Sequence, residues 1–132
     1  MKTLKRDKKI QARLKLGNGQ VITVNLDAMS IMREFGPKWN VLAEAEQKAV
    51  AAVNTPTSDA ETIFEAYGNA IFAVMDLFFG EKQRNYIVAF YENNYLEMSR
   101  IVLPFITDDL MKQVLNILGK QRDELAKKYS GR

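Results

Sequence analysis

Residues 74–83, VMDLFFGEKQ, decide how the rest of the sequence is interpreted. They close the longest apolar run of the chain, residues 70–79, and pass at once into charged residues. Upstream, apolar positions recur at helical spacing, which predicts a helix over about 59–79. The second half of this helix is apolar on nearly all sides, so we expect it to be the buried central helix of the fold. Gly80 is expected to end it.

Strand and turn signals precede this helix. Apolar and polar residues alternate over 10–16 and again over 22–26, as they do in half-buried strands. Asn18-Gly19 lies between the two runs and predicts a type I′ turn, in which both central residues take positive φ. We therefore expect a β-hairpin over about 9–26.

Helix-boundary residues predict five to six helices, and hence an α+β fold that is mostly α-helical. Asp27 is a good N-cap, and Gly36-Pro37 is expected to end one helix and begin another. Ser58 and Glu61 match a capping box at the start of the central helix. The other helices are expected over about 38–53, from Glu81 to an Asn93-Asn94 connection, over 95–103 before Pro104, and over about 108–128 with Thr107 as N-cap.

Length and charge indicate one domain with a basic arm. The chain has 132 residues, of which 47% are hydrophobic and 27% charged, as in globular domains. We expect a single domain over 1–132, with a basic arm at 1–8, the hairpin, and a helical body over 27–128. A basic arm can contact nucleic acid or an acidic partner, but no aromatic residue lies there to stack on bases. A solvated arm before a lysine-protected edge strand is favoured, and nucleic acid is not expected as a partner.

The missing residue types restrict the chemistry. The chain has no cysteine and no histidine, which removes thiol nucleophiles, thiolate metal ligands and the commonest general base. Asp108-Asp109 and Asp123-Glu124 are adjacent acidic pairs, but neighbouring helical residues point about 100° apart and do not converge on one ion. We predict no catalytic residue, no cofactor and no metal, and therefore no enzyme.

Targeting and membrane signals are also weak. The longest apolar run is interrupted by Asp76 and is shorter than the roughly 20 residues of a membrane span. The N-terminus lacks the apolar region of a signal peptide. A cytosolic protein without membrane contact is expected.

Aromatic residues after Gly80 are spaced for one helical face followed by a turn. Core packing is the default interpretation, and a partner surface is the alternative because aromatic side chains are enriched at interfaces. The central helix adds a second candidate surface, on the face that lies off its main apolar stripe. Together they give six candidate partner-binding residues: Phe72, Phe79, Tyr86, Phe90, Tyr91 and Tyr95.

The order of these features resembles a known family. A short basic hairpin leads into an Asp-led helix, a polar loop follows, and a long helix closes in IFAVMDLFFGEKQ. This order resembles the small tail assembly chaperones of long-tailed, siphovirus-type bacteriophages of Gram-positive bacteria. The similarity spans about residues 10–92 and is carried by Val24, Leu26, Asp27, Phe35, Phe72, Asp76, Leu77, Phe78, Phe79, Gly80 and Glu81.

The resemblance implies a non-catalytic viral protein that acts in the host cytoplasm and is absent from the mature virion. Such proteins bind the tape measure protein, keep its hydrophobic helices soluble and help to recruit tail tube subunits. Many are also made in a longer, frameshifted form, and self-association is a further option. Two alternatives stay open: a structural virion protein, such as a head–tail connector or tail completion protein, and a basic-armed DNA-binding regulator.

Overall fold

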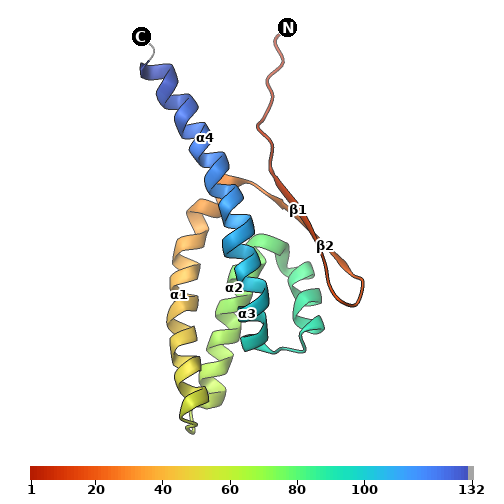
Figure 1. Cartoon of the computed structure of the whole chain (residues 1–132), viewed down its shortest axis with the longest axis vertical. Coiled ribbons are helices and arrows are strands. Elements are labelled where there is room, and N and C mark those ends of the chain that lie inside the picture. The colour runs from red at the N-terminus through yellow and green to blue at the C-terminus, as the bar shows by residue number, and fades with distance from the viewer. Residues whose placement is uncertain (131–132) are drawn as a thin grey trace.

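The structure is a computed structural model, and it describes residues 1–130 of the chain. Within these residues, an N-terminal β-hairpin is followed by three helices, of which the second is kinked (Figure 1). The expectation of a mostly helical protein with an N-terminal hairpin is confirmed. The expected number of five to six helices is wrong, because two predicted breaks, at Gly36-Pro37 and at Pro104, lie inside continuous helices.

The hairpin consists of β1 (Ile10–Lys15) and β2 (Val21–Leu26), which pair antiparallel with Arg13 opposite Thr23. Alternate side chains of both strands are buried or half-buried, so one face of the hairpin covers the core and the other faces solvent. This is the pattern that the alternating sequence predicted.

The turn of the hairpin differs from the predicted type I′ turn. Gly19 has φ 93°, whereas Asn18 does not have positive φ. The Gly19 N–H donates to the Leu16 carbonyl at 2.9 Å, and the Leu16 N–H donates to the Gln20 carbonyl at 2.8 Å. The result is a three-residue loop with a single left-handed glycine. Asn18 favours this form because its Oδ1 accepts from the Gln20 N–H at 3.0 Å.

The first helix, α1 (Ala28–Asn54), begins where Asp27 predicted. The Asp27 carboxylate accepts from the Ser30 N–H at 3.1 Å, and this bond is the main reason that the pKa of Asp27 is lowered. The predicted end at Gly36-Pro37 is wrong, since α1 runs through both residues.

The apolar stripe of α1 keeps its phase across Gly36-Pro37. Pro37 removes one backbone donor, but both residues of the pair are exposed, so the freed carbonyl lies on the side that water reaches. Phe35 and Trp39 stack on either side of the pair with ring centroids 5.4 Å apart. Burial of one stripe against α2 therefore outweighs the local cost of the proline. The stripe comprises Ala28, Ile31, Phe35, Trp39, Leu42, Ala45, Ala49 and Ala52.

The second helix, α2 (Ala60–Phe90), has two arms that meet at Gly80. Gly80 has φ 78° and ψ 157°, a combination that is essentially restricted to glycine. The predicted break at Gly80 is therefore confirmed, and the second arm turns away from the first (Figure 1).

The capping box predicted from Ser58 and Glu61 is wrong. The N-cap residue of α2 is Asp59, and its side chain makes no capping hydrogen bond. Thr57 organises this turn instead, because its Oγ1 accepts from the Asp59 N–H at 3.3 Å and its carbonyl accepts from the Ala60 N–H at 3.3 Å. The backbone turn moves the helix start one residue beyond the predicted cap.

The third helix is a continuous rod. It comprises α3 (Tyr95–Pro104), the π-helical segment η1 (Phe105–Leu110) and α4 (Met111–Ser130). The predicted connection at Asn93-Asn94 leads directly into it, and the Asn94 side chain caps its start. The rod passes through Pro104, where a helix end was predicted.

A π-turn replaces the predicted break and restart. Thr107, expected as an N-cap, lies inside η1, and its hydroxyl donates to the Leu103 carbonyl at 3.2 Å. The Met111 N–H bonds to the Ile106 carbonyl five residues back, as in a π-helix. Ile106 and Leu110, which both lie in this segment, are fully buried.

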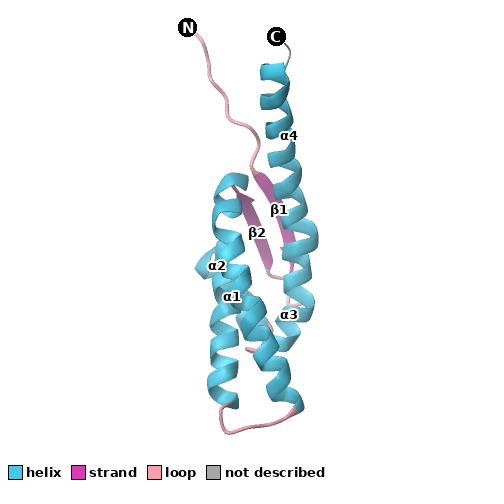
Figure 2. Cartoon of the chain, turned by 90° about the vertical axis from the view of Figure 1, so that its left-hand side faces the viewer, coloured by secondary structure: helices cyan, strands magenta, loops and turns pink. Residues whose placement is uncertain are grey.

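These elements form one body with two projections. α1 and the first arm of α2 lie side by side and antiparallel, and the hairpin lies with β2 toward α2 and β1 toward α4 (Figure 2). The end of α4 and the N-terminal arm extend beyond the body in the same direction (Figures 1 and 2). Residues 1–8 have no regular secondary structure and are exposed.

Candidate functional site

The corner at Gly80 is held to the hairpin by Gln83. The Gln83 amide donates to the Phe79 carbonyl at 2.9 Å and to the Thr23 carbonyl at 2.7 Å. Its Oε1 accepts from the Thr23 N–H at 2.8 Å. One side chain therefore caps the first arm of α2 and binds the outer edge of β2.

Arg84 ties the two arms of α2 together. Its Nε lies 2.7 Å from Asp76 Oδ1, across the Gly80 corner, and its guanidinium lies 4.7 Å from the centroid of the Phe72 ring. Residues 74–83, together with Arg84, thus act as the scaffold of the corner.

Three of the six predicted partner-binding residues, Phe72, Phe79 and Tyr95, are buried or half-buried by packing within this chain. Phe79 is only 5% exposed, so it is not available to a partner in this conformation. Phe72 and Tyr95 are half-buried and meet edge to face, with centroids 5.9 Å apart. Tyr95 makes a second edge contact with the buried Tyr67. The off-stripe face of the central helix is thus a packing surface inside this chain.

The other three candidates lie nearer the surface. Tyr86 is exposed. Phe90 and Tyr91 contact each other and line a groove of about 220 Å³ between the hairpin tip and the rod. Gly17 of the tip approaches so closely that an added Cβ would lie 3.1 Å from Phe90 Cζ. Ile101 and the residues around it close the groove on the side of the rod.

A polar contact inside the helical body joins α1, α2 and α3. The Tyr67 hydroxyl donates to Glu46 Oε1 at 3.0 Å and contacts the Ser99 hydroxyl. Burial, reinforced by the Glu46 carboxylate, raises the pKa of Tyr67 to about 12. Next to it, Gly68 lies so close to the Tyr95 ring that an added Cβ would overlap it. These residues fix the helix packing and offer no open site.

α4 carries a row of leucines that the body covers only in part. Val114 is fully buried, whereas Leu115 and Leu125 are 55% and 57% exposed. Together with the half-buried Leu118, these leucines form what we call the distal stripe: Leu115, Leu118 and Leu125. The sequence shows leucines on one face of this helix. It does not show that the helix extends past the body, so the distal stripe was not among the predicted partner-binding residues.

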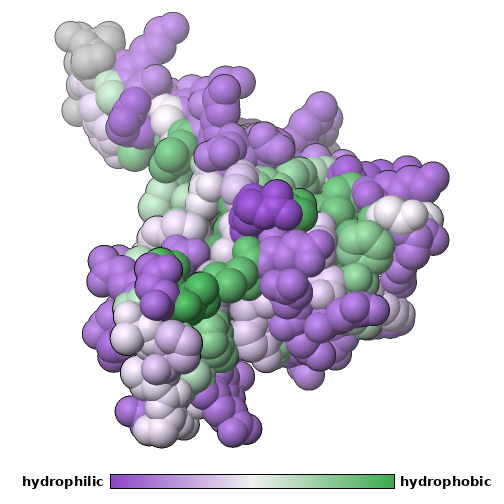
Figure 3. Space-filling model, turned by 60° about the horizontal axis from the view of Figure 1, so that its bottom comes forward, coloured by the Kyte–Doolittle hydropathy of each residue, from purple (hydrophilic) through white to green (hydrophobic). Residues whose placement is uncertain are grey.

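Other exposed apolar residues are dispersed. On the face in Figure 3, apolar side chains form short patches among hydrophilic ones. α1 and α2 border a groove of about 360 Å³ at Val41, Ala45 and Ile63, with Glu44 and Lys48 at its sides. Charged side chains therefore border this groove.

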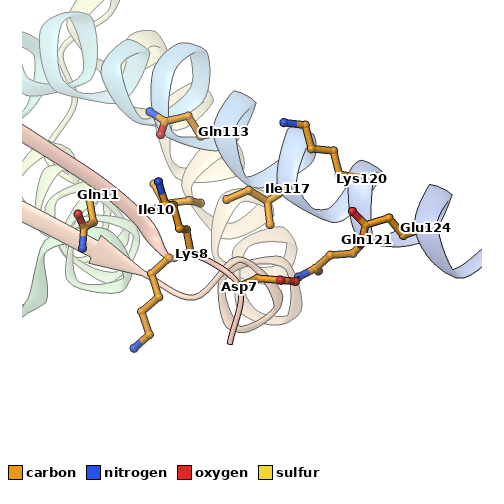
Figure 4. Close-up of a pocket in the computed structure, with 10 residues that line it drawn as sticks. Asp7, Lys8, Ile10, Gln11, Gln113, Ile117, Lys120, Gln121 and Glu124 are labelled. Atoms are coloured by element: carbon orange, nitrogen blue, oxygen red, sulfur yellow. The ribbon is translucent and has the colours of Figure 1, made fainter. Parts of the chain in front are cut away.

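A cavity of about 480 Å³ lies between the start of β1 and α4. Ile10 and Ile117 point toward each other across it, and Lys8 points away (Figure 4). The Gln121 amide donates to Asp7 at 2.9 Å and joins the arm to α4. The lining mixes apolar, cationic and acidic groups, so it has no single chemical preference.

The acidic and apolar residues of the described part of the chain bear on metal binding and on membrane crossing. Among residues 1–130, no three acidic side chains gather where they could hold a metal ion. In the same residues, α2 is the one helix long and apolar enough in composition to cross a membrane. Gly80 breaks α2, and its apolar residues Tyr67, Ile71 and Val74 are fully buried in the core. Packing within this chain accounts for its apolar character.

Comparisons with protein-family models, with curated proteins and with solved structures found no match to this chain. Its function is therefore inferred from the surfaces described above and from the residues of the family resemblance. The distal stripe and the groove at Phe90 and Tyr91 are the surfaces on which the proposal below rests.

Proposed function

We propose that the protein is a tail assembly chaperone of a long-tailed bacteriophage of Gram-positive bacteria. It binds the tape measure protein, keeps it soluble and helps to recruit tail tube subunits. It acts without catalysis in the host cytoplasm, makes no membrane contact and does not remain in the mature virion. The observation that carries the proposal is the distal stripe of α4, and the residues of the family resemblance support the same role.

The distal stripe has the geometry for pairing with another helix. Leu115, Leu118 and Leu125 follow the three- and four-residue spacing of a helix-packing seam, with Arg122 in the position between the last two. The helix projects from the body, so a partner helix can lie along it (Figure 1). A long client rich in apolar helices would be held through such seams.

The size of the stripe favours reversible binding. Fully burying a leucine contributes about 1.5–3 kcal/mol, and Leu115 and Leu125 are each already partly covered. The stripe therefore supplies only a few kcal/mol before the entropic cost of association. That is weak for a permanent complex and suitable for a chaperone that leaves the assembled tail. Phe90 and Tyr91 offer a second contact for the client.

Co-expression with the tape measure protein of the same phage tests the proposal. We expect the tape measure protein to be soluble and to co-purify when this chain is present, and to aggregate when it is absent. A tape measure protein that aggregates equally in both cases contradicts the proposal. Detection of the chain in purified virions would instead favour a head–tail connector or tail completion protein.

A further inference from the structure

The two edges of the hairpin are protected to different degrees. On β2, the outward N–H and C=O of Thr23 are both bound by the Gln83 side chain, at 2.8 and 2.7 Å. The amide of Gln83 thus occupies the place that a neighbouring strand would take. No comparable side chain of residues 1–130 bonds to the outward backbone of β1.

The register identifies the open backbone groups of β1. Thr23 points its backbone groups away from β1, so its partner Arg13 points its own away from β2. The alternation of an antiparallel ladder gives the same orientation to Gln11 and Lys15. Three N–H groups and three C=O groups therefore line an edge to which a strand can pair.

The surroundings of this edge favour an acidic and apolar occupant. Gln11, Arg13 and Lys15 also expose their side chains, and the solvent face of the hairpin carries cations but no acidic residue. On the other face, β1 is flanked at its end by the mainly apolar groove at the hairpin tip. Side chains of an added strand would alternate between the cationic face and the face that carries this groove.

We propose that the outer edge of β1 binds an extended segment of a partner protein, in which acidic and apolar residues alternate, as a third strand. Backbone hydrogen bonds to Gln11, Arg13 and Lys15 supply the pairing. Charge complementarity with Arg13 and Lys15 selects acidic residues at alternate positions. This site is separate from the distal stripe and does not depend on the proposed chaperone function.

Peptide binding tests this proposal directly. The probe is a short peptide in which Glu alternates with Val, compared with the same peptide carrying Lys in place of Glu. A third peptide keeps Glu but has N-methyl groups on the amides that would face β1. We expect the Glu peptide to bind about tenfold more tightly than either control and to slow amide hydrogen exchange at Gln11, Arg13 and Lys15.

Two variants distinguish the contribution of the Arg13 backbone N–H to binding from that of its side-chain charge. Arg13→Pro removes an outward N–H and a charge while keeping the ladder bonds to β2, and Arg13→Gln removes only the charge. We expect Arg13→Pro to weaken binding of the Glu peptide about tenfold more than Arg13→Gln does. Replacing both Arg13 and Lys15 by Glu should reverse the preference, toward the Lys peptide.

Several outcomes overturn the proposal. The proposal fails if the three peptides bind equally or not at all, or if hydrogen exchange slows on α4 and not on β1. Binding of a single-stranded oligonucleotide in place of the Glu peptide would identify the cationic face as a nucleic-acid surface. If Arg13→Pro does not fold, as judged by the amide spectrum of the hairpin, the N-methylated peptide still decides whether backbone pairing occurs.

Discussion

Gly68 lies where the first arm of α2 packs against the Tyr95 ring. An alanine methyl at this position would overlap the ring, and Tyr95 is itself held by Phe72. We expect Gly68→Ala to destabilise the protein by about 1–3 kcal/mol, measured by urea unfolding. Gly119→Ala is the control, because its Cβ would meet only the end of the Arg122 side chain. If Gly68→Ala and Gly119→Ala have the same free energy of unfolding, Gly68 does not pack closely against the Tyr95 ring.

The buried hydroxyl of Tyr67 predicts a loss of stability in alkali. Its pKa is raised from 10.0 to about 12, so the folded state keeps a proton that the unfolded state releases above pH 10. The free energy of unfolding should fall by up to about 1.4 kcal/mol per pH unit between these values, and not below them. Tyr67→Phe should cost about 0.5–1.5 kcal/mol at neutral pH and show a smaller alkaline loss. Identical alkaline losses in both proteins would contradict this assignment.

Single residues were predictable where one local force dominates. Asp27 caps α1 through its own side chain, and Gly80 takes a conformation that few other residues can adopt. Ser58 and Thr107 also carry good capping side chains, yet neither begins a helix. At these two positions, a turn set by Thr57 and a π-turn within the rod decide the backbone.

At the scale of elements, Gly36 and Gly80 look alike in sequence but have opposite roles. Gly80→Ala should destabilise the protein by about 1–3 kcal/mol, because alanine must adopt φ 78° at the corner. Gly36→Ala should stabilise it by about 0.5–1 kcal/mol, because Gly36 lies inside α1 with nothing near its Cβ position. Chemical unfolding of both variants tests the pair. Equal changes in the free energy of unfolding would mean either that Gly80 does not adopt a positive φ or that helix α1 does not continue through Gly36.

The predicted helix breaks failed for a physical reason. Proline and glycine report the local cost of continuing a helix, and at Gly36-Pro37 and Pro104 that cost is small compared with the burial gained on both sides. In α1, the spacing of the apolar residues indicates that the helix continues, because Phe35 and Trp39 lie on one seam on either side of Gly36-Pro37. The π-turn after Pro104 leaves no comparable pattern in the sequence.

At the scale of the whole molecule, the burial of each apolar residue shows whether it packs inside the fold or is available to a partner. Periodicity shows that Phe79 and Leu125 are both apolar and both helical. Only the packing of all elements shows that Phe79 is enclosed and that Leu125 lies on a helix that extends past the body. The predicted partner-binding set therefore emphasised the corner at Gly80, whereas Leu115 and Leu125 on α4 are more exposed than the buried Phe79.

Loss of client binding on altering the distal stripe is the most direct test of the proposed function. The test variant carries Leu115→Gln and Leu125→Gln, and the matched control carries Val50→Gln and Val53→Gln on α1, which are 47% and 50% exposed in the native chain. All four changes are on helix surfaces, so each protein should keep its stability within about 0.5 kcal/mol per site.

The decisive measurement is the soluble fraction of the co-expressed tape measure protein with each variant. We predict that the wild type and the Val50/Val53 control keep it soluble and that the Leu115/Leu125 variant does not. Equal solubility with both variants would contradict the claim that the distal stripe binds the client. The same conclusion would follow if sedimentation showed that the Leu115/Leu125 changes only dissociate copies of this chain from each other.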